Sequence, residues 1–406
     1  MEPSQYGTAR QPRPLVFPPS HPGPLSRRAI PEQQLLGQGF PALLNPILEP
    51  LAAAVTAFPP TAASALPLKD KLPLVDRLAT LLQSLDRESV AGEALRRAWT
   101  VLDAAFTAAL GSEDGLECVC RALRHGIKAA GLSGQAMLPT LLQALPARFQ
   151  QTRHPALLYV ASELVKVFAR EPSAQAGLAP ILTSLIVSSC QELASLPALT
   201  SRPDLTDDLF LLAGRTLNYS PTLIVTPQVL PPLLDTALLA TLVQHREACR
   251  SALSFLRCLL HPSDAPAALA PTPAAQQLLR EQLLRAGPPL ARLLLAGAAG
   301  AQPDARVPDI AEPLGALLRL GGPQALSWVS SAVAAVPAVA LEAGDQQMFL
   351  GVSAVLANAA GSGGDAEQSE FEGALFRLAD LCRRNARARV AAQQALLPLE
   401  LQGVAV

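Results

Sequence analysis

Apolar residues recur at helical spacing along most of the chain. The stretch from Pro155 to Arg170 shows the pattern, with an apolar stripe at i, i+3, i+4, i+7 and i+11 formed by Leu157, Val160, Ala161, Leu164 and Phe168. Such a stripe is typical of a helix that packs one face against a core. The polar positions between them are expected to face away from that core, namely Ser162, Glu163, Lys166 and Arg170.

The same periodicity predicts further helices, most of them closed by proline or glycine. Their expected ranges are 72–85, 93–110, 115–130, 174–195, 204–217, 246–260, 272–285 and 370–384. Polar and acidic residues mark several helix starts, because the first backbone N–H groups of a helix need acceptors. Ser112 precedes one such start, and Asp204 and Asp309, each directly after a proline, lie at two others.

A dozen or more amphipathic helices without a strand pattern indicate an all-α protein. Half of the residues are apolar (50%) but only 4% are aromatic, and leucine and alanine favour helices over sheets. A spacing of about 40 residues per helix pair is typical of degenerate HEAT or armadillo repeats stacked into an α-solenoid. We expect this solenoid over residues 34–401, a disordered Pro/Arg-rich segment over 1–33, and a tail over 402–406.

Composition excludes several classes of protein. The net charge of −1 argues against general nucleic-acid binding, which needs a strong basic excess. Two long uncharged stretches, 51–68 and 321–341, contain prolines and are interpreted as buried helix pairs rather than membrane spans.

The sequence contains no recognisable catalytic or metal-binding pattern. Its five histidines form no metal or catalytic motif, and its six cysteines form no CxxC pair, so they are interpreted as buried thiols. Cys258 and His261 have a metal-like spacing but no second pair nearby in sequence. Asp204, Asp207 and Asp208 cluster where a helix dipole attracts acids. We therefore expect no enzyme activity, no catalytic residue, no cofactor and no metal.

One predicted helix, 115–130, carries a row of cations. Arg121, Arg124 and Lys128 follow one another at i, i+3 and i+7, so they lie within about 60° of each other and about 110° from the apolar face. The pattern alone favours a solvated face in which Glu117 pairs with Arg121. The alternative is a binding site for an extended, multiply phosphorylated ligand. A second basic run lies in the last helix and is interpreted as solvated, with Arg377, Arg383, Arg384, Arg387 and Arg389.

Six segments in a fixed order resemble the C-terminal half of the transportin-3-like receptors of the importin-β superfamily. They are EALRRAWTVLDAAF, LECVCRALRHGIKAAG, RHPALLYVASELVKVF, RPDLTDDLFLLAGRTLNYSP, REACRSALSFLRCLLH and VPDIAEPLGALLR, between residues 93 and 319. The resemblance runs from about residue 43 to residue 401. It implies a superhelix of HEAT repeats that carries SR-type splicing factors into the nucleus and shuttles between nucleus and cytoplasm.

The resemblance also implies a site and partners. An arginine-rich helix of the family binds phosphorylated Arg-Ser segments, and its positions match Arg121, Arg124 and Lys128. The third is a departure, because lysine keeps the charge but loses the bidentate geometry of arginine. With the family in view, we favour phosphoserine binding at this helix. The family also binds Ran and nucleoporins, and its Ran-binding N-terminal repeats lie outside the matching region.

Three other interpretations stay open. An importin-13-like receptor has the same architecture but carries protein cargo independently of phosphate, and the row of arginines argues against it. A HEAT-repeat scaffold, such as a phosphatase regulatory subunit, binds folded proteins in the same way. An RNA-binding solenoid fits the C-terminal arginines but not the neutral net charge.

Overall fold

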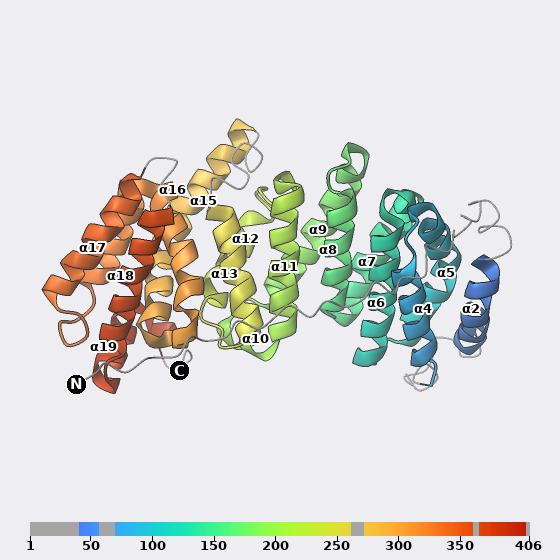
Figure 1. The fold of residues 1–406 in the computed structure, drawn as a ribbon, viewed down its shortest axis with the longest axis horizontal. Coiled ribbons are helices and arrows are strands. Elements are labelled where there is room, and N and C mark those ends of the chain that lie inside the picture. The colour runs from blue at the N-terminus through green and yellow to red at the C-terminus, as the bar shows by residue number, and fades with distance from the viewer. Residues whose placement is uncertain (1–39, 57–69, 261–271, 360–364, 403–406) are drawn as a thin grey trace, which may run out of the picture.

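The structure is a computed structural model that describes residues 40–56, 70–260, 272–359 and 365–402. Within these ranges all regular elements are helices, and they follow one another in an elongated array from α2 to α19 (Figure 1). The expectation of an all-α solenoid is confirmed. The segment 1–33, the loop 360–364 and the tail residues 403–406 lie outside the described residues.

The helices have the following bounds: α2 Phe40–Thr56, α4 Leu72–Ser84, α5 Glu88–Ala108, α6 Glu113–Ala130, α7 Leu138–Thr152, α8 Ala156–Phe168, α9 Pro172–Glu192, α10 Leu196–Ser201, α11 Pro203–Tyr219, α12 Leu230–Ala240, α13 Arg246–Leu260, α15 Pro273–Ala296, α16 Val307–Ala334, α17 Ala343–Asn358, α18 Asp365–Arg383 and α19 Ala386–Leu396. Most predicted ranges agree with these bounds to within a few residues.

The helices pack in two rows. In the first row α4, α6, α8, α11, α13 and α16 each pack against the next, and in the second row α7, α9, α12 and α15 do so. Helices that are consecutive in a row belong to successive repeats, so each repeat buries its apolar side against its neighbours. The apolar helix α9 is long enough to span a membrane by length and composition, and in this fold it packs against α7, α8 and α12.

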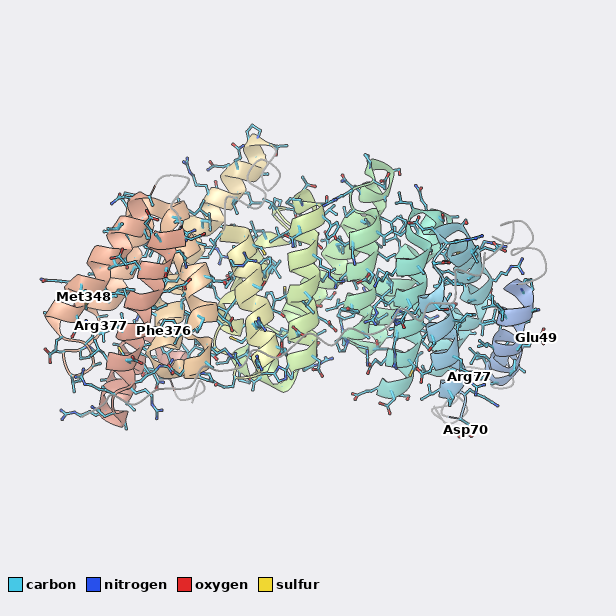
Figure 2. All side chains as sticks on the ribbon, in the orientation of Figure 1. Glu49, Asp70, Arg77, Met348, Phe376 and Arg377 are labelled. Carbon is cyan, nitrogen blue, oxygen red and sulfur yellow. The ribbon has the colours of Figure 1, made fainter. Side chains whose placement is uncertain are left out.

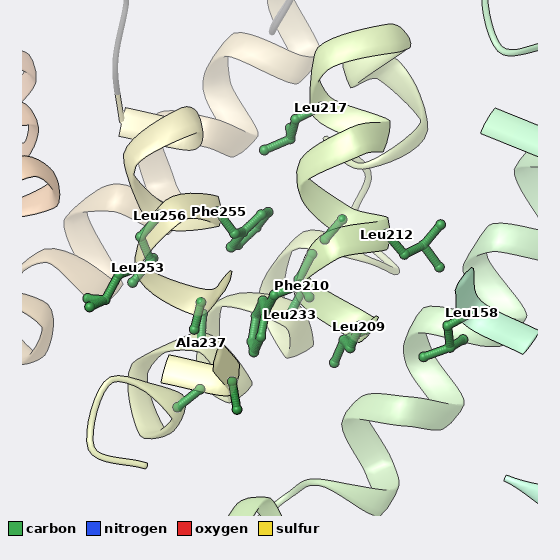
Figure 3. Close-up of a cluster of buried hydrophobic side chains, with 14 of the residues drawn as sticks. Leu158, Leu209, Phe210, Leu212, Leu217, Leu233, Ala237, Leu253, Phe255 and Leu256 are labelled. Atoms are coloured by element: carbon green, nitrogen blue, oxygen red, sulfur yellow. The ribbon is translucent and has the colours of Figure 1, made fainter. Parts of the chain in front are cut away.

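The core of the array is continuous, and α11 shows how it is built. Phe210 of α11 and Phe255 of α13 are both fully buried, with ring centroids 5.7 Å apart. Figure 3 shows them among leucines of α11, α12 and α13. A tilted pair at this separation contributes about 1 kcal/mol of stabilisation beyond that from the area that the two rings bury.

Helix α8 corrects one expectation about its polar face. All five residues of its predicted stripe are buried, but Ser162 and Glu163 are buried as well, at 0% and 4% exposure. Only Lys166 and Arg170 are exposed, as predicted. The reason is that α8 lies in the first row between α6 and α11, so that neighbouring repeats cover both of its flanks.

Prolines and glycines end fewer helices than predicted. Helix α15 was expected to stop at residue 285 but continues through Pro288 and Pro289 to Ala296. The residues around this proline pair, including Leu290, are buried, and packing offsets the lost backbone hydrogen bonds. In α16 the backbone turns sharply at Gly322, where φ is 52°, so one helix ends at the start of the uncharged stretch 321–341 and a second lies within it up to Ala334.

Candidate functional site

Helix α6 carries the predicted row of cations and has well-defined ends. The Ser112 hydroxyl accepts a hydrogen bond from the Gly115 N–H at 3.1 Å, as the predicted cap requires. Glu113 and Asp114 occupy the first turn, where the helix dipole favours acids. The helix ends at Gly131, which has a positive φ of 49°. Its apolar side packs on α4, α5 and α8, which leaves the cations along one edge.

The structure separates the three cations of α6. Arg121 lies toward α4, with its Nη2 3.5 Å from the Asp76 carboxylate, and it also donates to the Cys118 sulfur at 3.2 Å. Arg124 lies toward α8, and Lys128 is exposed. The alternative pair between Glu117 and Arg121 does not form, because the Asp76 carboxylate of the neighbouring helix takes the guanidinium instead.

Arg124 takes part in a stack that joins three helices. Its guanidinium carbon lies 4.6 Å from the centroid of the Tyr159 ring on α8, and that of Arg215 on α11 lies 5.2 Å from the same centroid. Arg215 Nη1 donates to Glu163 Oε1 at 2.6 Å and to the Ser162 hydroxyl at 2.7 Å. We call Arg124, Tyr159 and Arg215 the Tyr159 stack. It places one guanidinium at a fixed position beside α8.

A cavity of about 1100 Å³ opens between α6, α8 and α11. Arg121, Arg124 and Tyr159 line it, whereas Lys128 does not. The turns that precede the three helices close one end, so the N-termini of all three helices meet there. Six acids line the same cavity, namely Glu113, Asp114, Glu117, Asp204, Asp207 and Asp208. The cavity therefore presents acids at the helix N-termini and arginines further along α6.

Asp208 differs from the other acids of this cavity. Burial, reinforced by the nearby carboxylates of Asp207 and Asp204, raises its pKa to about 7. Arg215 and Arg124 oppose this rise but do not cancel it. Asp207 instead accepts a hydrogen bond from the Ser251 hydroxyl of α13. Asp208 is thus a half-buried carboxyl group without a hydrogen-bonded counter-ion among the described residues.

The other titratable groups near the cavity do not form a catalytic site. Burial lowers the pKa of His154 and of His125, so both rings are neutral at pH 7. Burial also raises the pKa of the Cys120 thiol well above its usual range, which makes it a poor nucleophile. None of the six cysteines forms a disulfide, and five of them are buried, as expected. Across the described ranges no cluster of ligands suits a metal ion, and His261 lies outside them.

The second basic run is not simply solvated. Arg383 donates to the carbonyl groups of Ala298 and Gly297 at 2.8 and 3.0 Å, and Arg384 to that of Val339 at 2.8 Å. The first two carbonyls lie directly after α15, and that of Val339 lies in the turn between α16 and α17. Arg377 pairs with Asp345 at 3.1 Å on the α17–α18 side of the molecule (Figure 2). Four of the five arginines are exposed, as the predicted solvated face requires, and only Arg383 is half-buried.

Sequence reasoning missed the residues that hold Arg124 at the cavity. It identified Arg121 and Arg124, but Tyr159, Glu163 and Arg215 carry no local signal of their own. Arg215 lies 52 positions from Glu163 in the sequence, and only the stacking of repeats brings the two together.

Three comparisons place the chain beside known proteins. Residues 91–193 match the family model described as the transportin-3/importin-13 fourth TPR domain. The chain is 30% identical over 330 residues to transportin MOS14 of Arabidopsis thaliana, a match that covers 80% of this chain and 33% of that protein. Together with the fold, these matches support a karyopherin of the transportin/importin-β family.

A solved structure of importin 13 in its cytosolic state has the same fold. It superposes with a TM-score of 0.69 and 16% sequence identity over 86% of this chain and 39% of that chain. Members of the karyopherin family are transport receptors and not enzymes. The chain spans about a third of the length of the curated relative that it matches. The matched region 91–193 contains α6 and α8, whereas α11 follows it.

Proposed function

We propose that the chain is the cargo-binding part of a nuclear import receptor and that its α6–α8–α11 cavity binds the phosphorylated Arg-Ser segment of SR-type splicing factors. The observation that carries the proposal is the convergence of Arg121 and Arg124 on one cavity that six acids line at the N-terminal ends of its helices. An Arg-Ser segment with phosphorylated serines alternates anions and cations, so it needs both kinds of partner in one groove.

The arginines of the cavity suit the phosphates of such a ligand, and the acids of the cavity suit its arginines. A guanidinium donates two parallel hydrogen bonds to a phosphate, and these bonds are stronger than those between neutral groups. Asp208 belongs to the acidic half of the site: burial and then the carboxylates of Asp207 and Asp204 raise its pKa to about 7, and it forms no ion pair among the described residues. A ligand arginine beside Asp208 supplies a cation and lowers its pKa.

Lys128 contributes least in this proposal. It is exposed, lies outside the cavity wall and forms no ion pair within the described ranges. An exposed lysine adds a long-range attraction of less than about 1 kcal/mol that salt screens. The binding residues are therefore Arg121 and Arg124, with Lys128 as an outer cation.

The wider import cycle belongs to the same proposal and comes from the family relationship. The receptor moves between cytoplasm and nucleus, passes the pore by contacts with nucleoporins, and releases its cargo in the nucleus when Ran in the GTP form binds to it. None of the described residues is assigned to Ran or to nucleoporins.

A phosphate-independent, importin-13-like receptor is the second candidate. The superposition on importin 13 favours it, as do the protein partners that both arginines already have. If Arg121 and Arg124 serve only to join α6 to α4 and α8, the cavity binds a folded protein without regard to phosphate.

Peptide binding separates the two candidates. We expect an Arg-Ser repeat peptide with phosphorylated serines to bind at least tenfold more tightly than its unphosphorylated twin. The variant Arg121→Glu/Arg124→Glu is expected to lose about 100-fold in affinity for the phosphopeptide, because two charge-assisted contacts of about 1.5 kcal/mol each are removed.

The matched control is Arg387→Glu/Arg389→Glu, which makes the same charge change on two exposed residues of α19. Titration calorimetry or fluorescence anisotropy measures the affinities, and circular dichroism checks that both variants are folded. Equal binding of the two peptides to the unmodified chain contradicts the phosphate-binding proposal and favours the importin-13-like candidate.

A further inference from the structure

We propose that Tyr159 is a positioning residue for phosphate binding, a role that rests on the function proposed above. Its ring holds the Arg124 guanidinium at the wall of the cavity. The Glu163–Arg215 pair holds the ring from the α11 side. Arg124 therefore has a fixed position before the ligand binds.

The geometry of the Tyr159 stack supports this role. An arginine side chain has several rotatable bonds, and fixing it on binding costs roughly 1 to 2 kcal/mol. The Tyr159 ring lies 4.6 Å from the Arg124 guanidinium carbon, well within the range of a cation–π contact. Because Arg124 and Tyr159 both line the cavity, the arginine is held where a ligand phosphate arrives.

The other side of the stack is anchored in the core. Glu163 is 4% exposed and its carboxylate bonds to Arg215 at 2.6 Å, so this pair cannot move without exposing a buried charge. The hydroxyl of Ser162, which is fully buried, accepts a hydrogen bond from the same guanidinium nitrogen and restricts it further. Arg215 in turn lies 5.2 Å from the Tyr159 ring centroid. The ring is thereby confined between two neighbouring helices.

Arg215 is not counted among the phosphate ligands. Its charge is balanced by Glu163 at 2.6 Å, and it does not line the cavity. Arg124 has no carboxylate within ion-pair distance among the described residues, so its charge remains available. The two arginines of the Tyr159 stack therefore have different roles: Arg124 binds and Arg215 supports.

Two substitutions of Tyr159 test the role of the ring. Tyr159→Leu removes the aromatic face but keeps an apolar side chain, and we expect it to lower phosphopeptide affinity about fivefold. Tyr159→Phe keeps the face, and its affinity is expected to equal that of the unmodified chain, because the hydroxyl forms no hydrogen bond to the described residues. The unphosphorylated peptide is expected to bind all three proteins alike.

The salt dependence of binding distinguishes positioning from general stability. The slope of log affinity against log salt is expected to fall by about one unit in Tyr159→Leu, although no charge has been removed, because Arg124 no longer meets a phosphate. A variant that is only less stable loses apparent affinity for both peptides. Once its affinity is corrected for the folded fraction, its dependence on salt equals that of the unmodified chain. Thermal melting of each variant gives the folded fraction.

The possible failures are distinguishable. If Arg121→Glu/Arg124→Glu abolishes the preference for phosphate while Tyr159→Leu retains the full affinity and slope, the positioning role is wrong and the proposed function stands. The same conclusion follows if Tyr159→Phe loses as much as Tyr159→Leu. If the unmodified chain does not prefer the phosphopeptide, the proposed function and the positioning role both fail.

Discussion

Two arginine-rich regions of this molecule look alike in sequence but differ in what their guanidinium groups contact. At the end of α18, Arg383 and Arg384 donate to backbone carbonyl groups of distant segments, directly after α15 and in the turn between α16 and α17. In α6, Arg121 and Arg124 line a cavity of about 1100 Å³. The spacing of arginines along a helix is therefore a weak guide to binding. The surface that the neighbouring helices place opposite them decides whether they hold the fold together or face a ligand.

The largest expected effect concerns the support of the α6 region. Arg215→Met removes the partner of Glu163, which is 4% exposed, and is expected to lower the free energy of unfolding by about 3 kcal/mol. The double variant Glu163→Leu/Arg215→Met removes the uncompensated charge and is expected to recover most of that loss. Urea unfolding followed by circular dichroism measures both.

The control for this prediction is Arg250→Met on α13. Arg250 is more than half exposed and its nitrogen lies 4.0 Å from Asp309, so its loss is expected to cost less than about 0.5 kcal/mol. If Arg215→Met is as stable as this control, the buried ion pair does not anchor the Tyr159 stack.

The next effect concerns the acidic wall and depends on pH. The pKa of Asp208 is about 7 in the folded protein and near 4 in the unfolded chain, so the folded state holds an extra proton between these values. Stability is therefore lost as pH rises from about 4 to about 7 and stays reduced above that. Asp208→Asn is expected to be more stable than the unmodified chain at pH 8 by roughly 2 kcal/mol, with the difference vanishing near pH 4.

Thermal or urea unfolding at a series of pH values measures this difference. The matched control is Asp114→Asn, at an exposed position of the same cavity whose carboxylate does not contribute to the raised pKa of Asp208. A constant difference between Asp208→Asn and the unmodified chain from pH 4 to pH 8 contradicts the assignment of a raised pKa to this carboxyl group.

The smallest effect tests the C-terminal region. Arg383→Met removes two hydrogen bonds to backbone carbonyls and is expected to cost about 1.5 kcal/mol in stability while leaving phosphopeptide affinity unchanged. Arg387→Met, at an exposed position of α19, is expected to change neither quantity. A marked loss of phosphopeptide affinity in Arg383→Met at full stability breaks the comparison, because the C-terminal arginines then also bind ligand.

Much of the fold was predictable because its signals are local. The apolar stripe of α8 and the Ser112 cap of α6 both appear in the structure as predicted. The predictions that failed concern contacts between repeats. Glu163 was expected to face solvent but lies buried beside Arg215, and α15 continues past its proline pair because buried neighbours hold it.

The sequence by itself determined the class of fold, the order of the helices and the cations at Arg121, Arg124 and Lys128, because each depends on residues within a few turns of one helix. Only the tertiary structure decided that Arg121 and Arg124 share a cavity with the acids of α11 and that Lys128 does not. It also decided that Tyr159 meets two guanidinium groups. These contacts join successive repeats across many intervening residues, and the packing of one repeat on the next is the physical cause that brings them together.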